Sequence, residues 1–150
     1  MKTQLVLYMV IVLTVAAVAV VSAQQSITAP LPVDLKIVLP DPIIPPEQAK
    51  FSGKWSGIWG GNVLEHIFVV EEVGTAGAKV VYAYGTAPTW NIHQPGWFRA
   101  NGQFVKGALV VETRRATITY RMNLNGTMMS ATYEGKGTAV YSTAKLSRIE

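Results

Sequence analysis

The chain has 150 residues, enough for one domain, with thirteen Lys and Arg against nine Asp and Glu and a formal net charge of +4. These charges are dispersed, and no basic run is longer than Arg114–Arg115, so a nucleic-acid partner is not expected. Cysteine is absent, which excludes a disulfide-stapled scaffold and a thiol nucleophile.

Residues 1–23 have the pattern of a secretory signal peptide. Lys2 precedes an apolar run from Leu5 to Val21, and Val21-Ser22-Ala23 matches a small-residue cleavage site. The run is also near the length of a bilayer span, so an uncleaved N-terminal anchor is the alternative. No basic stop-transfer flank follows, which favours cleavage after Ala23. We therefore expect a secreted or periplasmic protein that has no membrane span after cleavage.

Residues 24–50 form a proline-rich segment that holds six of the eight prolines. Proline fixes φ and lacks an N–H group, so this segment is expected to be extended rather than helical or part of a central strand. Its apolar residues, among them Leu35 and Ile44, would be a liability in water. The segment is therefore predicted to lie along the domain as a strap rather than to form a free linker, and a short motif that docks on a partner is the functional alternative.

Residues 51–150 are predicted to form an all-β domain, because short β-rich runs alternate with turn signals and no stretch keeps a helical period. The expected strands are residues 53–59, 63–73, 78–85, 97–104, 108–113, 116–123, 127–134 and 138–149. Asn125-Gly126 predicts a tight hairpin turn, whereas Asn101-Gly102 is either a bulge within a strand or a further hairpin.

Eight consecutive strands with short connections predict an antiparallel up-and-down barrel, because closure removes the exposed edges of a long meander. A β-sandwich is the alternative, although its Greek-key crossings need longer connections than most of these. The alternation also assigns inward faces, with Ala116, Ile118 and Tyr120 on one side of their strand. An eight-stranded barrel is either filled by its own side chains or holds one small ligand.

Gly53-Lys54-Trp55 at the start of the first strand and Arg148 near the end of the last resemble the pattern of the lipocalins and their calycin relatives. The resemblance implies a lipocalin-like barrel in which the Arg148 guanidinium covers the Trp55 indole at the closed end, with a ligand cup at the other end. The chain lacks the second lipocalin motif, disulfides and a C-terminal helix. It is also similar to uncharacterised secreted bacterial domains that accompany hydrolases, which implies an accessory role.

No enzyme signature is present: the chain has no Gly-x-Ser-x-Gly element and no glycine-rich phosphate loop. Two histidines, His66 and His93, without a spaced carboxylate partner do not predict a metal site, and no cofactor is expected. His66 is expected to face the interior, either as a core residue satisfied by a backbone carbonyl or a tyrosine, or as a polar contact for a ligand. Arg114 and Arg115 could contact anions, but solvated charges at a hairpin tip are the favoured interpretation.

The connection in residues 84–98 is unusually long for a meander and concentrates aromatic side chains. It could form the gate of a ligand site at the barrel mouth, or Trp90 and Trp97 could fold inward as a plug. The predicted ligand-binding residues are Tyr84, Trp90, Asn91, His93 and Trp97 from this region, with His66 and Tyr120 from the interior.

The sequence thus predicts a non-catalytic domain that binds a small hydrophobic or amphipathic ligand at the barrel mouth. A different class of function is the alternative, in which the barrel is filled and the domain docks on a partner protein or glycan. Interior tyrosines and methionines such as Tyr82, Tyr133 and Met129 suit either state, because their volumes alone do not decide between a filled interior and a void.

Overall fold

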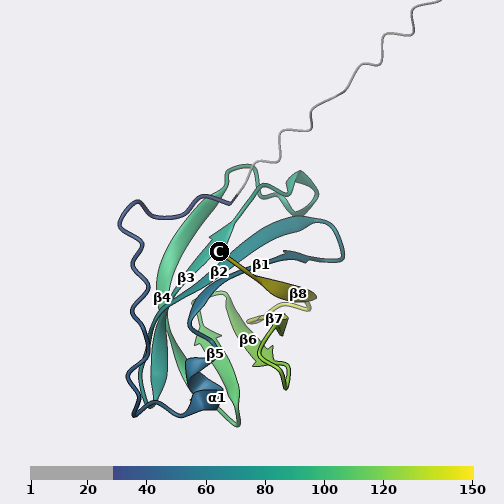
Figure 1. Ribbon diagram of the computed structural model, residues 1–150. Helices are drawn as coiled ribbons and strands as arrows, with labels where there is room; N and C mark the ends of the chain where they lie inside the picture. Colours follow the sequence, from purple (N-terminus) through teal and green to yellow (C-terminus); the bar gives the residue numbers. More distant parts are fainter. Residues whose placement is uncertain (1–28) are drawn as a thin grey trace, which may run out of the picture.

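The computed structural model describes residues 29–150 and shows a closed barrel of eight antiparallel strands (Figure 1). The strands are β1 (Gly53–Trp59), β2 (Leu64–Val73), β3 (Gly77–Tyr84), β4 (Gly96–Val105), β5 (Ala108–Glu112), β6 (Ala116–Met122), β7 (Met128–Gly135) and β8 (Tyr141–Ile149). A four-residue helix, α1 (Pro46–Ala49), precedes β1, and a 3-10 helix, η1 (Pro88–Trp90), lies between β3 and β4.

Each strand pairs with its neighbours in the chain, and β8 pairs with β1 to close the barrel. The closing register runs from Lys54 opposite Ile149 to Gly57 opposite Leu146. The predicted all-β up-and-down barrel is therefore confirmed, and the sandwich alternative is wrong. The closed meander is consistent with a calycin-like fold.

Asn101 and Gly102 lie within the continuous strand β4. This strand pairs with β3 on one side and with β5 on the other, and neither register shifts at these two residues. They therefore form neither the hairpin nor the bulge that the sequence left open.

Strict alternation of side chains decides which residues fill the barrel. On β2, Leu64, His66, Phe68 and Val70 face inward and are buried, as their period-two spacing predicts. A bulge between Val70 and Glu72 interrupts this pattern and leaves Glu71 nearly buried on the outer side. The same alternation fills the interior from β6 and β7, with Ala116, Ile118, Tyr120, Met129 and Ala131.

One end of the barrel is closed by Trp55 and Arg148. The Arg148 Cζ lies 4.2 Å from the centroid of the Trp55 ring, and its two terminal nitrogens donate to the carbonyls of Ser52 (2.7 Å) and Lys50 (2.8 Å). Gly53 has a φ of +116°, and a Cβ there would lie 2.6 Å from Arg148 Nη1, so the motif needs glycine at this position.

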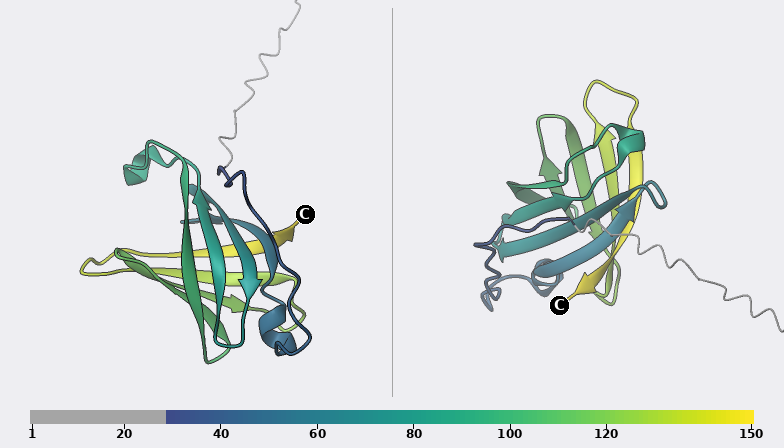
Figure 2. Two further views of the ribbon diagram at one scale, coloured as in Figure 1. Left: turned by 90° about the vertical axis from the view of Figure 1, so that its left-hand side faces the viewer. Right: turned by 90° about the horizontal axis from the view of Figure 1, so that it is seen from above.

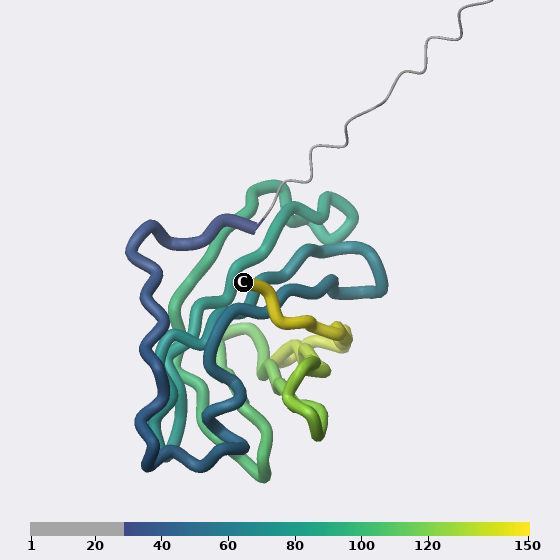
Figure 3. Tube along the Cα trace, viewed as in Figure 1, coloured from purple at the N-terminus to yellow at the C-terminus, as the bar shows by residue number. Residues whose placement is uncertain are grey.

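Residues 29–50 run along the outside of the barrel, from the end where η1 lies to the closed end where α1 lies (Figures 1 and 3). Ala29, Leu31 and Leu35 pack on the outward faces of β2 and β3, and Ile44 joins the barrel core. Figure 2 shows the same segment on the outside of the barrel from two further directions. The predicted signal peptide lies outside the described residues. No helix within residues 29–150 is long and apolar enough to cross a membrane.

Candidate ligand-binding cavity

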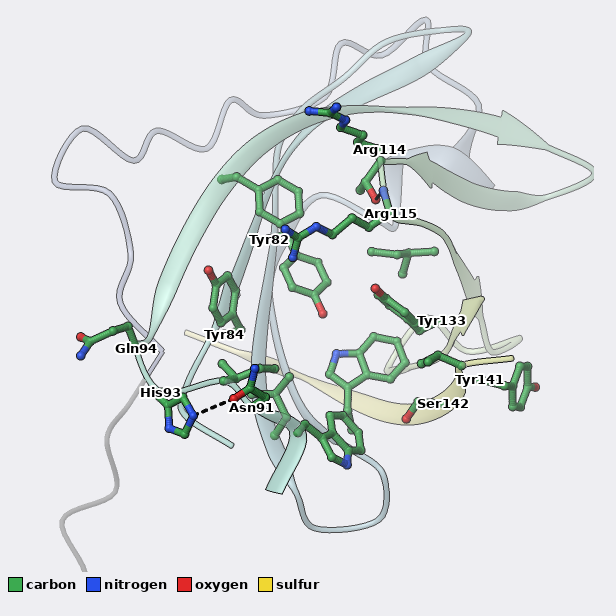
Figure 4. Close-up of a pocket in the computed structure, with 18 of the residues that line it drawn as sticks. Tyr82, Tyr84, Asn91, His93, Gln94, Arg114, Arg115, Tyr133, Tyr141 and Ser142 are labelled. Carbon is green, nitrogen blue, oxygen red and sulfur yellow. Dashed lines mark hydrogen bonds between the residues drawn. The ribbon is translucent and has the colours of Figure 1, made fainter. Parts of the chain in front are cut away.

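The barrel contains a cavity of about 1170 Å³ at the end opposite Trp55 and Arg148. Its walls come from the inward faces of several strands and from the three connections that follow β3, β5 and β7. Aromatic side chains dominate the lining, namely Trp59, Tyr82, Tyr84, Trp90, Phe98, Tyr133 and Tyr141. Figure 4 shows the hydroxyls of Tyr82 and Tyr133 directed into the cavity and Tyr141 directed away from it. The interior is therefore filled at one end and hollow at the other.

The connection between β3 and β4 forms one side of the cavity mouth. Ala87 and Ile92 exchange two backbone hydrogen bonds of 2.8 and 3.0 Å, and the residues between them form η1. Asn91 ends η1 in the left-handed conformation with a φ of 58°, which asparagine tolerates, and its Oδ1 lies 2.9 Å from His93 Nε2. These contacts make the tip of the connection a compact hairpin rather than an open loop.

Trp90 projects from this tip and packs on the neighbouring β1–β2 turn. A Cβ at Gly60 would lie 2.5 Å from Trp90 Cζ2, so the indole lies directly on the glycine backbone. Trp90 is 40% exposed, which means that it covers the rim without filling the interior. The connection is thus a lid at the edge of the cavity, and Trp90 is not an inward plug.

The structure separates the residues that the sequence grouped as a ligand site. Tyr84, Trp90, Asn91 and His93 all line the cavity. Trp97 does not: it lies on the outward face of β4, 42% exposed, and the Arg99 guanidinium is 5.5 Å from its ring. Side chains alternate along β4, so Phe98 faces the cavity and its neighbour Trp97 faces outward.

His66 and Tyr120 lie below the cavity and do not line it. Both are fully buried, and His66 Nε2 is 2.9 Å from the Tyr120 hydroxyl while His66 Nδ1 is 2.9 Å from the Ala83 carbonyl. A carbonyl only accepts, so Nδ1 carries the hydrogen and the Tyr120 hydroxyl donates to Nε2. Burial lowers the pKa of His66 to about 4, and the Ala83 carbonyl opposes this shift. His66 is therefore a neutral core residue with both ring nitrogens engaged.

Two buried polar atoms of the cavity wall have no hydrogen-bond partner within the described part of the chain. They are Nε1 of Trp59, whose residue is 1% exposed, and Oγ of Ser142. Burial raises the pKa of Tyr82 above its usual range, and the nearby Trp59 indole opposes that rise. The indole N–H and the Tyr82 hydroxyl nevertheless do not reach hydrogen-bond geometry. Neither Trp59 nor Ser142 was among the predicted ligand-binding residues, although alternation from Trp55 and from Leu146 places both on inward faces.

The mouth is positively charged. Arg114 and Arg115, at the β5–β6 turn, line the cavity, and its lining includes no carboxylate among the residues described. Figure 4 shows the Arg115 side chain reaching over the cavity and Arg114 pointing away from it. The nearby Lys136 is already paired with Glu112 at 2.6 Å. Solvated charges were the favoured expectation at this turn, and only the closure of the barrel brings Arg115 to the mouth.

Within residues 29–150, no group of three or more His, Cys, Asp or Glu side chains is placed to hold a metal ion. No protein-family model, no curated protein and no solved structure matches the chain. The cavity itself is therefore the observation from which a function can be inferred.

Proposed function

We propose that this protein is a secreted or periplasmic, non-catalytic binding domain that takes up one small amphipathic ligand through the open end of its barrel. The hollow, aromatic-lined end of the interior carries this proposal. The cavity is open to solvent at its mouth, and its volume of about 1170 Å³ lies slightly above the roughly 300–1,000 Å³ of typical ligand pockets, so it has room for one small ligand.

The lining favours a ligand that is apolar along most of its length. The rings of Tyr84, Phe98 and Tyr133 line the cavity and are partly exposed, and such rings bind apolar and aromatic groups through burial and stacking. Arg115 at the mouth and the absence of carboxylates from the described lining favour a negative charge on the outer end of the ligand. An amphipathic anion with its apolar part inside matches this arrangement.

The rival function, a filled barrel that docks on a protein or glycan, predicts an interior without a cavity. The closed half does have that character, because Phe51, Trp55, Phe68 and Tyr120 pack there with nearly no exposure. The open half does not, and this difference favours ligand uptake over a purely structural barrel.

Titration of the full chain with dansylaminoundecanoic acid, a fluorescent amphipathic anion, tests the proposal. We expect saturable binding with a dissociation constant on the order of micromolar, and energy transfer from tryptophan to the bound dansyl group. Tyr84→Ala should weaken binding severalfold because it removes part of the cavity wall. Trp97→Ala is the matched control, since this aromatic residue of the adjacent strand faces outward.

Equal loss of affinity in both variants would place the probe on the outer surface and contradict the proposal. Absence of saturable binding would do the same. It would direct attention to the alternative of a protein or glycan partner.

A further inference from the structure

We propose that the open end of the barrel docks on the surface of an anionic lipid bilayer, from which the domain takes up its amphipathic ligand. The docking surface is the rim of the mouth, which consists of four connections, residues 60–63, 85–95, 113–115 and 136–140, together with Tyr141 at the start of β8. This inference deepens the proposed function and rests on it, because it names the source from which the ligand enters the cavity.

The residues of the rim lie together at one end of the barrel. Alternate connections of an antiparallel meander lie at the same end, and these four follow β1, β3, β5 and β7. Figure 4 shows Arg114 and Tyr141 on different sides of the mouth, each with its side chain directed away from the cavity. A ligand inside the cavity therefore leaves both side chains able to contact a surface that the open end meets.

The charged residues of the rim are all positive. They are Arg114–Arg115 and Lys136, and the rim contains no Asp or Glu. The carboxylates of the adjoining strands, Glu65, Glu112 and Glu134, lie on outward faces of the barrel wall. Lys136 pairs with Glu112 at 2.6 Å, whereas neither arginine forms an ion pair within residues 29–150. The two arginines therefore present positive charge that anionic lipid headgroups attract.

The rim also exposes apolar and aromatic side chains. Trp90 of the lid is 40% exposed, Val140 is 56% exposed and Tyr141 is 63% exposed. Tryptophan and tyrosine are enriched where proteins meet the interface of a bilayer, because their rings are apolar and their polar atoms reach the headgroups. Cations and aromatic rings around one opening are thus the combination that binds an anionic bilayer.

The closed end of the barrel does not combine these features. Its exposed apolar side chains, such as Leu124 in the β6–β7 turn, are not aromatic. The carboxylates of Asp41 and Glu47 belong to the part of the chain that reaches this end. The open end is therefore the one that meets the bilayer, and a lipid-like anion that leaves the bilayer there enters the cavity without exposing its apolar part to water.

Cosedimentation of the mature form, residues 24–150, with lipid vesicles tests the docking. This form contains every described element and lacks the apolar run of residues 5–21, so that run cannot cause binding. We expect binding to vesicles of phosphatidylcholine with about 30% phosphatidylglycerol, and binding more than about tenfold weaker to phosphatidylcholine alone. The emission of Trp90, measured in a Trp97→Phe background, should shift to the blue when the vesicles bind.

Two matched pairs of variants test which end docks. Arg114→Gln should weaken binding to the anionic vesicles about fivefold, because it removes one cation from the rim. Arg121→Gln is its control, since this exposed arginine lies near the other end of β6. Tyr141→Ser should weaken binding severalfold, whereas Leu124→Ser, which removes an exposed apolar side chain at the closed end, should change it little.

Absence of binding to the anionic vesicles, or equal binding with and without phosphatidylglycerol, would overturn the inference. Equal losses in the rim variants and their controls would also overturn it, because the protein would then adsorb without a preferred end. A dimer in solution that Tyr141→Ser dissociates would place a second copy of the chain on the rim instead of a bilayer. In each of these cases saturable binding of the dansyl probe would leave the proposed function intact, and absence of that binding would overturn both.

Discussion

His66 is a titratable side chain that is fully buried in the barrel. Its two nitrogens are engaged by Ala83 and Tyr120, and its ring lies 4.2 Å, centroid to centroid, from that of Tyr82. Burial penalises the imidazolium, so the native pKa is about 4 against 6.5 for the free side chain. Between these pH values the unfolded chain binds a proton that the native state does not, and the free energy of unfolding rises with pH.

Lowering the pH from 7 to 4 should therefore remove about 3 kcal/mol of stability through His66. His66→Gln should lose this component, because glutamine can donate to Ala83 and accept from Tyr120 without titrating. Urea unfolding of both proteins between pH 7 and pH 4 measures the difference. Carboxylates such as Glu71, whose pKa Arg99 lowers, titrate in both proteins and cancel. Parallel pH profiles for the two proteins would contradict the assignment.

The lid between β3 and β4 depends on one close approach between elements. Gly60, in the β1–β2 turn, has a φ of +66° and lies against the Trp90 indole, whereas Gly61 has a φ of +81° and open space within 4 Å of where a Cβ would lie. Alanine at either position costs about 1–2 kcal/mol of backbone strain. Gly60→Ala also displaces Trp90, whereas Gly61→Ala does not. Comparison of the two variants therefore separates the effect of the contact between Trp90 and Gly60 from the effect of backbone strain.

We expect Gly60→Ala to expose Trp90 and to change the affinity for the dansyl probe, while Gly61→Ala changes stability alone. Acrylamide quenching in a Trp97→Phe background reports on Trp90, because Trp55 and Trp59 are buried. Equal quenching in the two alanine variants would show that Trp90 does not depend on the contact with Gly60.

Across the whole molecule, the N-terminal strap is fastened to the barrel by polar contacts as well as by apolar packing. Arg99 on β4 donates to Glu71 at 2.9 and 3.1 Å and to Asp34 of the strap at 3.0 Å. The Lys36 amide donates to Glu71 Oε1 at 3.3 Å, and the Val38 amide donates to the Glu71 carbonyl at 2.8 Å. The bulge in β2 turns Glu71 toward this cluster.

Arg99→Gln should therefore loosen the strap without opening the barrel. We expect severalfold faster hydrogen–deuterium exchange at the Lys36 amide and unchanged exchange in β6 and β7. Lys79→Gln is the control, because it breaks the exposed Lys79–Glu72 pair between β3 and β2. Protection at Lys36 that is the same in both variants would mean that apolar packing alone holds the strap.

Local pattern predicted the elements closely. The expected first strand, residues 53–59, coincides with β1, and the other expected runs overlap their strands with small shifts at the ends. The largest shift is at β8, which begins at Tyr141 rather than Thr138, because residues 136–140 form the turn. Period-two alternation and turn residues act over a few neighbours, so they are readable from sequence.

The sequence by itself therefore determined the strands, their order and their inward faces, because these depend on neighbouring residues. Only the tertiary structure decided which end of the barrel is hollow and which residues meet there. It placed Trp97 outside the cavity, His66 and Tyr120 beneath it, and the unpaired Trp59 and Ser142 in its wall. The position of each inward side chain along the barrel axis depends on the registers of all eight strands. These registers are fixed together only when β8 pairs with β1.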